Sequence, residues 1–485
     1  MNRREFLRAS AGIAAMVATW RLSLGEPVKN RKLNVLLITA DDMNYDAPGF
    51  AGGRTPGLTP NLDRLAKESL YFKRAHVAAA ICQPSRQSMM TGLYPHNNGA
   101  LGFGPINSGV ATLQERLRGA GYVNGILGKV NHLAPREKFC WDYVKEQKEL
   151  GEGRDPALYY RYVKEFLAKA QAEGKPFFLM ANSHDPHRPF AGSVAEKQWE
   201  TRRKIPHPEV RRTFKPDKIA VPGFLPDLPG VRKEVAEYYT SAHRCDETIG
   251  QVLRALKESG QEEETLVMFL SDNGMSFPFA KANCYLSSTN TPWLVRWPGK
   301  TKPGSVDEAH FICGVDFMPT ILDACGLEPP AGLDGRSFAG LLTGDKQDGR
   351  ESVFTVINTL ATRKSYPMRC LQNQRFGYIY NAWSDGQAAY YTTESRGSLA
   401  FRAMQEAAKT DPRIAGRVEL FEHRVKEELY DFEKDPSALT NLVDDPAYKE
   451  ALAQMRRAMR DAMTRTKDPV IRKFGFSPPA TQPGG

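Results

Sequence analysis

Four short apolar runs recur along the chain, and a group of polar residues follows each of them. The runs span Leu33–Thr39, Tyr122–Leu127, Pro176–Ala181 and Thr265–Ser271. Their short length and nearly continuous apolar character are typical of strands that are buried on both faces. The pattern therefore predicts four strands of a mainly parallel sheet.

Helical patterns, with apolar residues at helical spacing, lie between these runs. They span Leu62–Phe72, Leu113–Gly121, Tyr160–Gly174 and Val235–Gly260, and several end in glycine, as helices that lead into a strand often do. Alternating strands and helices indicate the α/β class, with helices covering both faces of the sheet. We expect one large α/β domain over residues 29–350.

The pattern changes near Ser352. Residues 365–383 and 388–395 alternate like antiparallel strands, and residues 448–466 form a helical pattern. We expect a smaller C-terminal subdomain with an antiparallel sheet over residues 351–485. The proline-rich stretch 202–230 has weak periodicity and is predicted to be a long loop, of the kind that often covers a site.

The N-terminus has paired arginines at positions 3 and 4, followed by an uncharged, largely apolar stretch from Ala9 to Trp20. It resembles a twin-arginine export signal, which we assign to residues 1–28. The alternative is a basic amphipathic start of the first helix. The resemblance predicts the twin-arginine export machinery as a partner and a periplasmic or extracellular location. No run of eighteen apolar residues occurs, so we expect no membrane span.

Composition and charge narrow the function classes. The chain has 485 residues, 41% of them hydrophobic, and a formal net charge of +10, which is compatible with an anionic substrate. No basic run is interleaved with aromatic residues and no nucleic-acid motif occurs, so we expect no nucleic-acid partner. The 7 cysteines include no C-x-x-C pair, which excludes zinc-ribbon and thioredoxin-like sites.

The polar groups that follow the apolar runs contain residues suited to catalysis. In chain order they are Asp41 and Asp42, Lys129 and His132, His184 and His187, and Asp272 and Asn273. In a parallel sheet, ligands bind outside the carboxyl ends of the strands. We therefore expect these side chains to meet at one edge of the sheet, the alternative being four unrelated solvated loops.

Asp41, Asp42, Asp272 and Asn273 are hard oxygen donors without a histidine or thiolate beside them. This donor type suits Ca²⁺ or Mg²⁺ rather than zinc. An Asp-Asp pair after one strand would, taken alone, indicate a helix cap or a turn. A second acidic loop at the same sheet edge favours a metal site.

Lys129, His132, His187 and Arg86 would surround this cation with positive charge and proton donors. The combination suits transfer of a tetrahedral oxyanion, through charge stabilisation and acid catalysis of the leaving group. A lone histidine is more often structural, but three histidines in two strand-end loops favour a functional role. His184 is the exception, because holding its loop would explain it equally well.

The stretch ICQPSRQSMMTG, residues 81–92, is typical of a helix that ends at Gly92. Pro84 suits the first helical position, which places Cys82 at or just before the helix start. Arg86 lies one turn later on the same face, so Cys82 and Arg86 would frame a small anion site. The alternative is a buried structural cysteine beside a solvated arginine.

Cys82-Gln83-Pro84-Ser85-Arg86, followed by Thr91-Gly92, resembles the motif of the type I sulfatases, in which this cysteine is oxidised to Cα-formylglycine. The resemblance covers nearly all of the chain after the export signal. It implies an alkaline-phosphatase-like fold with a catalytic domain at 29–350, a sulfated saccharide as substrate, and a formylglycine-generating or equivalent maturation enzyme as partner. The implied ligands of one Ca²⁺ are Asp41, Asp42, the modified Cys82, Asp272 and Asn273. The implied lining of the sulfate pocket is Arg86, Lys129, His132, His187 and Lys281.

Several segments resemble the heparan N-sulfatase (sulfamidase) branch of that family more closely, namely SHDPHRP, SDNGMSFPFAKANCY, SYPMR and ELYDFEKDP. This likeness implies N-sulfoglucosamine of heparan or heparin type as the substrate. Two departures concern the substrate more than the reaction class. Lys281 stands where sulfamidases have an arginine, and the spacing from Lys129 to His132 is one residue longer than in many sulfatases.

The resemblance also gives Cys82 a chemical role that an unmodified side chain does not fill. A thiol or serine that attacked sulfur would leave a sulfated side chain that hydrolyses slowly. A hydrated aldehyde attacks with one hydroxyl and expels sulfate when the other is deprotonated. The expected roles are charge stabilisation by Arg86 and Lys129, proton acceptance by Asp272, proton donation to the leaving group by His187 with Lys281, and assistance in collapse of the intermediate by His132.

Three alternatives stay open from the sequence. The first is an O-sulfatase that acts on another sulfated polysaccharide. The second is a phosphoester or phosphonate hydrolase of the same superfamily, which would use a threonine or serine nucleophile and two metals. The third is a non-catalytic glycan-binding protein with an unmodified Cys82. A serine hydrolase is disfavoured because no G-x-S-x-G motif occurs.

Overall fold

The four apolar runs form adjacent strands of one sheet in the computed structural model, which describes residues 32–392 and 397–475. They are β1 (Asn34–Ala40), β4 (Val123–Leu127), β6 (Phe177–Asn182) and β7 (Thr265–Ser271). The central strand β1 pairs in parallel with β6 on one side and with β7 on the other, and all of its residues are buried. The predicted parallel arrangement is confirmed. The export signal predicted for residues 1–28 lies outside the described residues.

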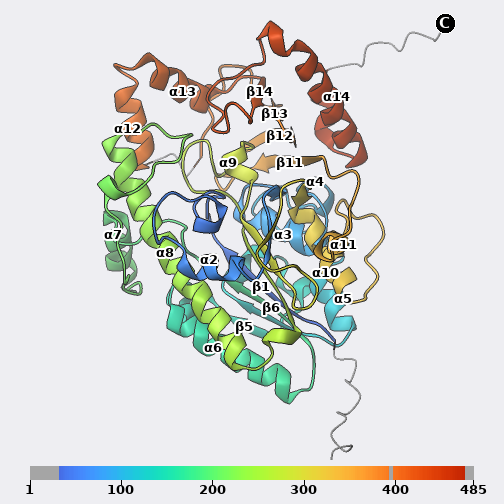
Figure 1. Cartoon of the computed structure of the whole chain (residues 1–485). Coiled ribbons are helices and arrows are strands. Elements are labelled where there is room, and N and C mark those ends of the chain that lie inside the picture. The colour runs from blue at the N-terminus through green and yellow to red at the C-terminus, as the bar shows by residue number, and fades with distance from the viewer. Residues whose placement is uncertain (1–31, 393–396, 476–485) are drawn as a thin grey trace, which may run out of the picture. The chain divides into compact units, whose positions relative to one another are not determined.

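The full sheet has eight strands in the order β5-β4-β6-β1-β7-β8-β2-β9. Figure 1 labels its strands β1, β5 and β6. The outer strands are β5 (Tyr143–Lys145), β8 (Trp293–Arg296), β2 (Leu70–Phe72) and β9 (Ser305–Asp307). Strand β8 runs antiparallel to both of its neighbours, so the sheet is mixed but mainly parallel. This arrangement agrees with the predicted α/β class.

One predicted helix is shorter than expected. Helix α2 (Pro60–Ala66) ends within the stretch predicted to be helical to Phe72, and the last residues of that stretch form β2. Leu70 and Phe72 are buried, and β2 pairs with β8. Pairing with a distant strand buries these side chains, and this tertiary contact outweighs the local helical pattern.

Helices cover both faces of the sheet. On one face, Leu36 and Ile38 of β1 pack in a core shared with α2, α6 (Pro156–Ala172) and α8 (Pro229–Glu258). On the other face, Val35 and Leu37 pack in a second core with α3 (Cys82–Thr91), α5 (Leu113–Gly119) and α10 (Phe317–Ala324). Because both faces of β1 are covered, the strand is apolar throughout rather than alternating.

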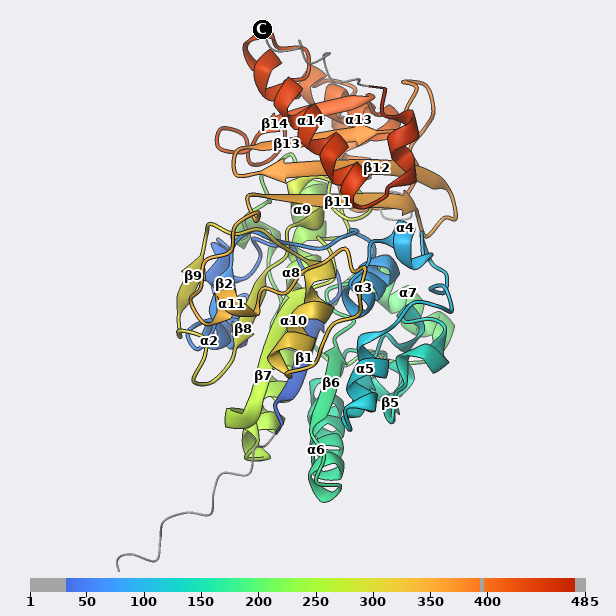
Figure 2. The same ribbon diagram turned by 90° about the vertical axis from the view of Figure 1, so that its right-hand side faces the viewer.

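The C-terminal part forms a separate four-stranded antiparallel sheet. Its strands, in spatial order, are β11 (Ser352–Thr359), β12 (Ser365–Asn373), β13 (Phe376–Asn381) and β14 (Glu427–Asp431). Helix α14 (Lys449–Arg465) packs against this sheet through a row of buried methionines, Met455, Met459 and Met463. Figure 2 shows this sheet beyond the carboxyl ends of β1, β6 and β7. The predicted small antiparallel sheet is therefore present.

One predicted strand of this region is wrong. Residues 388–392, the described part of the stretch 388–395, are irregular. Tyr390 instead turns inward, where its ring lies 4.9 Å from that of Tyr366 and 5.7 Å from that of Phe421. In this segment, packing of the Tyr390 ring against other aromatic rings takes the place of the predicted strand pairing.

The loop predicted at 202–230 is irregular over most of its length. Its first residues end α7 (Val194–Arg203), and its last residues begin α8. The described residues also form α4 (Pro95–Asn98), α9 (Leu286–Thr289), α11 (Ala339–Leu342), α12 (Leu399–Ala407) and α13 (Pro412–His423), and a two-stranded sheet of β3 (Ala75–His76) and β10 (Ile312–Cys313). The 3₁₀ turns are Gly49–Ala51, Val130–His132, Arg136–Phe139, Gln147–Leu150, Pro216–Lys218, Glu262–Glu264, Gly314–Asp316, Pro446–Tyr448 and Pro469–Lys473.

Within residues 32–392 and 397–475, no helix combines the length and the apolar character that crossing a membrane requires.

Candidate active site

The acidic loops after β1 and β7 meet at the carboxyl edge of the sheet. The backbone N–H of Asp42 donates to Asp272 Oδ1 at 3.1 Å, and Asn273 Nδ2 donates to Asp42 Oδ1 at 2.6 Å. Asp41, Asp42, Asp272 and Asn273 are all fully buried. The structure therefore brings the four oxygen donors named from the sequence into one cluster.

This cluster fits a hard cation. Oxygens of Asp41, Asp42 and Asp272 lie within 4.8 Å of one another. Several of the buried oxygens, among them Asp41 Oδ1, Asp42 Oδ2 and Asn273 Oδ1, accept no hydrogen bond from the described residues. Buried acceptors without a partner are costly, and a divalent cation would satisfy them. Carboxylate and amide oxygens are the ligands that Ca²⁺ prefers.

The pKa values of the three carboxyl groups in the cluster are shifted in different directions. Burial raises the pKa of Asp272 to about 7, with the charge of Asp41 adding to the effect. Burial likewise raises the pKa of Asp42 to about 6, against the opposing charge of Lys281. Burial also works against the charge of Asp41, but Lys129 and other cations outweigh it and hold the pKa of Asp41 well below its ordinary value. A bound cation would favour the charged form of all three carboxylates.

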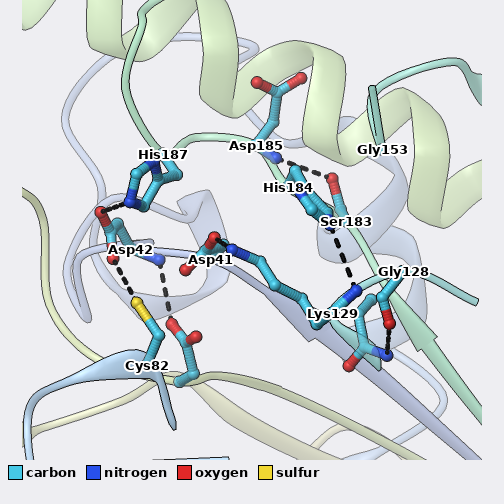
Figure 3. A network of polar contacts seen from close by, with 12 residues as sticks. Asp41, Asp42, Cys82, Gly128, Lys129, Gly153, Ser183, His184, Asp185 and His187 are labelled. Atoms are coloured by element: carbon cyan, nitrogen blue, oxygen red, sulfur yellow. Dashed lines mark hydrogen bonds and ion pairs between the residues drawn. The ribbon is translucent and has the colours of Figure 1, made fainter. Parts of the chain in front are cut away.

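Three cations face the three carboxylates, and Figure 3 shows the first of these pairs, Lys129 with Asp41. The pairs are Lys129 with Asp41, Lys281 with Asp42 (Nζ to Oδ1, 2.6 Å) and Arg86 with Asp272 (Nη2 to Oδ2, 2.8 Å). Such a set can bind an anion beside a metal ion, because every positive group already points at the same small region.

Arg86 is held by several buried partners. Its side chain is fully buried, and its Nη1 donates to Thr39 Oγ1 at 2.8 Å and to Asn182 Oδ1 at 2.6 Å. These two partners lie at the carboxyl ends of β1 and β6, so the guanidinium is fixed against the sheet edge. Sequence reasoning named Arg86 but missed Thr39 and Asn182, which look like ordinary strand residues.

Cys82 is the first residue of α3, and the helix ends at Gly92 in the left-handed region (φ 67°) as the sequence predicts. Pro84 is its third residue rather than its first, a position that still requires no donated N–H. The Cys82 Sγ lies 3.0 Å from Lys281 Nζ and 4.0 Å from Asp42 Oδ1. Burial raises the pKa of the Cys82 thiol well above its ordinary value. The unmodified thiol is therefore a poor nucleophile here, although it faces the site.

His187 approaches the cluster from the loop after β6. Its Nδ1 is 2.7 Å from the Arg188 carbonyl oxygen and so donates to it, while Nε2 lies 3.9 Å from Asp42 Oδ2. Burial and the nearby Lys281 lower the pKa of His187 to about 3. The fixed Nδ1–H leaves Nε2 as the atom that can exchange a proton in the site.

The other two histidines differ in their surroundings. His184 is buried, and its Nε2 accepts a hydrogen bond from the backbone N–H of Lys129 at 3.3 Å (Figure 3). His184 thus holds the turn in which Lys129 adopts a left-handed backbone (φ 56°), which is the loop-holding alternative named from the sequence. His132 is half-buried and lies edge-on to Phe103, with ring centres 5.7 Å apart.

A cavity of about 460 Å³ opens over the cluster. Cys82, Lys129, His132, His187 and Lys281 line it together. It is far larger than a sulfate ion needs, so most of its wall can contact the rest of a substrate. The further lining residues include Phe103, Glu146, Gln147, Arg154, Arg188, Trp199, His207, Leu360 and Ala361.

A buried network that sequence reasoning missed holds the histidine loop. Asp185, between the two histidines, forms ion pairs with Arg154 and with Arg244, whose Nε lies 2.6 Å from Asp185 Oδ2. Arg154 Nη2 also donates to the His187 carbonyl oxygen at 3.0 Å. One available signal was Arg244, which α8 buries together with the charged residues Glu234 and Asp246.

A family model described as "Sulfatase" matches residues 33–327, which is more than half of the chain. The chain belongs to the sulfatase family. A second model, described as "N-sulphoglucosamine sulphohydrolase, C-terminal", matches residues 276–385 of this sulfatase. The family resemblance inferred from Cys82 to Gly92 is thereby confirmed, and the protein is a hydrolase of sulfate esters or sulfamates.

Known proteins show the similarity in more detail. Human (Homo sapiens) N-sulphoglucosamine sulphohydrolase is 31% identical over 476 residues, which are 91% of this chain and 92% of the human protein. A solved complex with the substrate D-glucosamine-2-N,6-O-disulfate matches with a TM-score of 0.66 at 18% identity, covering 90% of this chain and 99% of that chain. The phosphonate monoester hydrolase of Agrobacterium radiobacter matches with a TM-score of 0.65 at 18% identity, covering 90% of this chain and 96% of that chain. Both solved structures share the alkaline-phosphatase-like sulfatase fold with this sulfatase.

Sulfatases generally use a formylglycine and a divalent metal ion, and the buried acidic residues of this sulfatase are suitable ligands for such an ion.

Proposed function

We propose that this sulfatase hydrolyses the sulfamate of N-sulfoglucosamine in heparan- or heparin-type saccharides. The observation that carries the proposal is the similarity to human N-sulphoglucosamine sulphohydrolase, which extends over 91% of this chain and 92% of the human protein. The match of the C-terminal model at residues 276–385 supports it, because this region includes the loop that carries Lys281.

We further propose that one Ca²⁺ is held by Asp41, Asp42, Asp272, Asn273 and residue 82, and that Cys82 is converted to Cα-formylglycine. The oxygen-only set of buried donors and the poorly nucleophilic thiol support these two assignments. When present, the ion supplies positive charge that orients the sulfo group, and the hydrated aldehyde supplies the hydroxyl nucleophile.

The chain's own cations have a distinct role in this proposal. Arg86 and Lys129 stabilise negative charge on the sulfo oxygens, since buried ion pairs with Asp272 and Asp41 hold both cations at the site before substrate binds. Asp272, which lies at the same sheet edge and pairs with Arg86, is the group we assign to accept a proton from the nucleophile. His132 lines the same cavity and assists release of sulfate.

His187, with Lys281, donates the proton that the leaving nitrogen needs. In the unliganded protein, burial and Lys281 keep His187 neutral at physiological pH. An anionic sulfo group bound beside Nε2 favours the protonated form, so binding of substrate prepares the acid. This step matters more for a sulfamate than for an aryl sulfate, because an amine anion is the poorer leaving group.

Maturation and location are part of the same proposal. A formylglycine-generating or equivalent enzyme modifies Cys82, and the twin-arginine machinery exports the chain to the periplasm or the cell exterior. The sequence motif at residues 82–86 and the paired arginines at positions 3 and 4 support these steps.

The proposal is tested by measuring sulfate release from a panel of defined saccharides. The panel contains N-sulfoglucosamine, glucosamine 6-sulfate, sulfated chondroitin and heparin disaccharides, an aryl sulfate and an aryl phosphate. We expect kcat/KM for N-sulfoglucosamine to exceed that for each O-sulfated sugar by about tenfold or more, as a difference of ~1.4 kcal/mol in transition-state binding requires.

Each of the alternatives predicts a different order of kcat/KM values, or no turnover, in this panel. Preference for an O-sulfated saccharide would identify an O-sulfatase, and preference for the aryl phosphate would identify a phosphoester hydrolase. No turnover at all, together with an unmodified thiol in the intact mass of the Cys82 peptide from the native host, would identify a glycan-binding protein.

A further inference from the structure

Trp199 and His207 form an aromatic pair in the wall of the active-site cavity. Their rings are stacked, with centres 4.6 Å apart and an angle of 23° between the planes, and both residues line the cavity. Trp199 belongs to α7, and His207 lies in the irregular segment that follows this helix. Neither residue belongs to the sulfate-binding cluster around Cys82.

The His207 ring is held in one orientation by buried charges. Its Nδ1 lies 2.8 Å from Glu196 Oε1, and its side chain is 2% exposed. Glu196 is held in turn by Arg244, whose Nη2 lies 3.3 Å from the same oxygen, and by the backbone N–H of Gly192, which donates to Oε2 at 2.6 Å. These partners lower the pKa of Glu196 although burial opposes its charge, so the carboxylate stays charged.

This arrangement fixes which atom of His207 is available to a ligand. Because Glu196 engages Nδ1, the other ring nitrogen, Nε2, is the one that can bond to a group in the cavity. The backbone N–H of His207 donates to Glu200 Oε1 at 2.7 Å. This hydrogen bond holds the segment that carries His207 against α7. A polar atom is thus preorganised beside the flat surface of Trp199.

The same network reaches the catalytic loop. Arg244 joins Glu196 to Asp185, and Asp185 lies in the loop between His184 and His187. The aromatic pair and the catalytic histidine are therefore positioned by one buried set of charges. This connection places the pair at a defined position relative to the reacting group, as a substrate-binding wall requires.

We infer that Trp199 and His207 form the sugar-binding wall of the site and contribute to its specificity for a pyranose. The inference rests on the proposed function. The indole ring packs against the C–H groups of the sugar, and Nε2 of His207 hydrogen-bonds a sugar hydroxyl. Pockets commonly combine an apolar aromatic surface with a few fixed polar atoms in this way.

The test separates sugar binding from sulfate binding on the matured, metal-loaded enzyme. KM for N-sulfoglucosamine is measured together with the inhibition constants of glucosamine and of inorganic sulfate. We expect Trp199→Ala to raise KM and the glucosamine inhibition constant by about tenfold and to change the sulfate constant by less than about twofold. Trp199→Phe, which retains a ring, should recover most of the loss.

A second substitution addresses His207, and a matched control addresses the helix. His207→Phe retains a ring but removes Nε2, and we expect it to weaken glucosamine binding without weakening sulfate binding. Lys197→Ala changes an exposed residue of the same helix that does not line the cavity, and all three constants should stay as in the wild type. Melting temperatures show whether each variant is folded.

The outcomes distinguish this inference from the proposed function. If wild type prefers another sulfated saccharide, the proposed function fails, and the same constants are measured with that saccharide and its desulfated sugar. Equal weakening of sugar and sulfate binding in both variants, or no weakening of sugar binding, overturns the inference. So does a wild-type enzyme that hydrolyses aryl sulfates alone and is not inhibited by sugars.

Discussion

At the scale of single residues, burial determines the chemistry of the site. The Cys82 thiol, Asp42 and Asp272 all have pKa values raised by removal from water, so each is less charged than it would be on the surface. Lys281 lies within hydrogen-bond reach of both Cys82 and Asp42. The site therefore favours binding of a charged partner, which is either a cation beside the carboxylates or an anionic substrate beside Lys281.

Replacement of Cys82 by alanine should abolish turnover. We expect kcat to fall by at least about 10⁴-fold, because we propose that this side chain supplies the nucleophile and that the remaining groups only bind and polarise the substrate. Sulfate release measures the loss, and the melting temperature should change little because the site is polar. Cys140→Ala, a half-buried cysteine outside the cavity, serves as the control and should retain full activity. Sulfate release by Cys82→Ala at the wild-type rate would contradict the proposal that residue 82 supplies the nucleophile.

Removal of the metal should lower both activity and stability. Without a cation, Asp41, Asp42 and Asp272 stay buried close to one another with oxygens that lack partners. Binding at a hundredfold excess over Kd would contribute about 2.7 kcal/mol to the free energy of unfolding. We expect a chelator to lower the melting temperature and sulfate release together, and added Ca²⁺ to restore both. An unchanged melting temperature after verified metal removal would contradict this expectation.

At the scale of secondary-structure elements, the site depends on how strand ends meet neighbouring turns. Gly274 follows Asn273 directly, and a Cβ at this position would lie 1.9 Å from the Ser287 carbonyl oxygen of α9. The Gly274 N–H also donates to the Ser288 carbonyl oxygen at 2.9 Å. Only glycine permits this approach, and it brings the loop after β7 against the segment that leads back from Lys281.

A buried ion pair connects two C-terminal elements and provides a pH-dependent prediction. Arg369 of β12 pairs with Asp468, which caps the last 3₁₀ turn, and both side chains are fully buried. Burial opposes the charge of Asp468, but Arg369 outweighs it and lowers the pKa of the carboxyl group. The pair therefore stabilises the fold above the unfolded pKa of about 3.9, and this contribution is lost as pH falls toward the folded value.

Asp468→Asn should lower the free energy of unfolding by about 3 kcal/mol at pH 7, since it leaves a buried guanidinium without its partner. The difference from wild type should shrink as pH falls below about 4, because the carboxyl group of the unfolded chain then binds a proton, and it should be lost once pH falls below the lowered native pKa. Urea unfolding at the two pH values measures both effects. Asp461→Asn, at an exposed position of α14, is the matched control and should be neutral. A difference that does not depend on pH would contradict the assigned charge.

At the scale of the whole molecule, the C-terminal sheet supports the loop that carries Lys281. Tyr285 OH donates to Glu428 Oε2 at 2.7 Å, and Arg424 contacts both Tyr285 and Asn283. Tyr390 donates to the Ala282 carbonyl oxygen next to Lys281. The loop that brings Lys281 to Asp42 is thus held from its outer side by residues of the C-terminal part.

This support predicts that the two parts unfold together. The core on one face of the large sheet includes Ile379 and Tyr430 of the small sheet, so few apolar contacts would survive their separation. Calorimetry should show one transition, and sulfate release should be lost over the same temperature range. A chain that ends at Arg350 should have no activity. Two well-separated transitions, with activity retained after the first, would contradict this prediction.

Several features of this sulfatase follow from its sequence alone. The four central strands, the helix at Cys82 that ends at Gly92, and the loops with Asp41 and Asp272 are all predictable, because local patterns record which faces are buried and where strands end. The motif from Cys82 to Arg86 also identifies the family. Such signals are local, so they can be recognised without any knowledge of tertiary packing.

Other features depend on contacts between residues far apart in the chain. The sequence predicts neither the pairing of Leu70–Phe72 with β8 nor the inward turn of Tyr390, because each depends on a partner that local periodicity does not reveal. The same holds for Arg244, which connects Asp185 to Glu196 and so holds His207 in the cavity wall. Tertiary structure decides these features, since burial of a charge is tolerated only where folding brings its partners together.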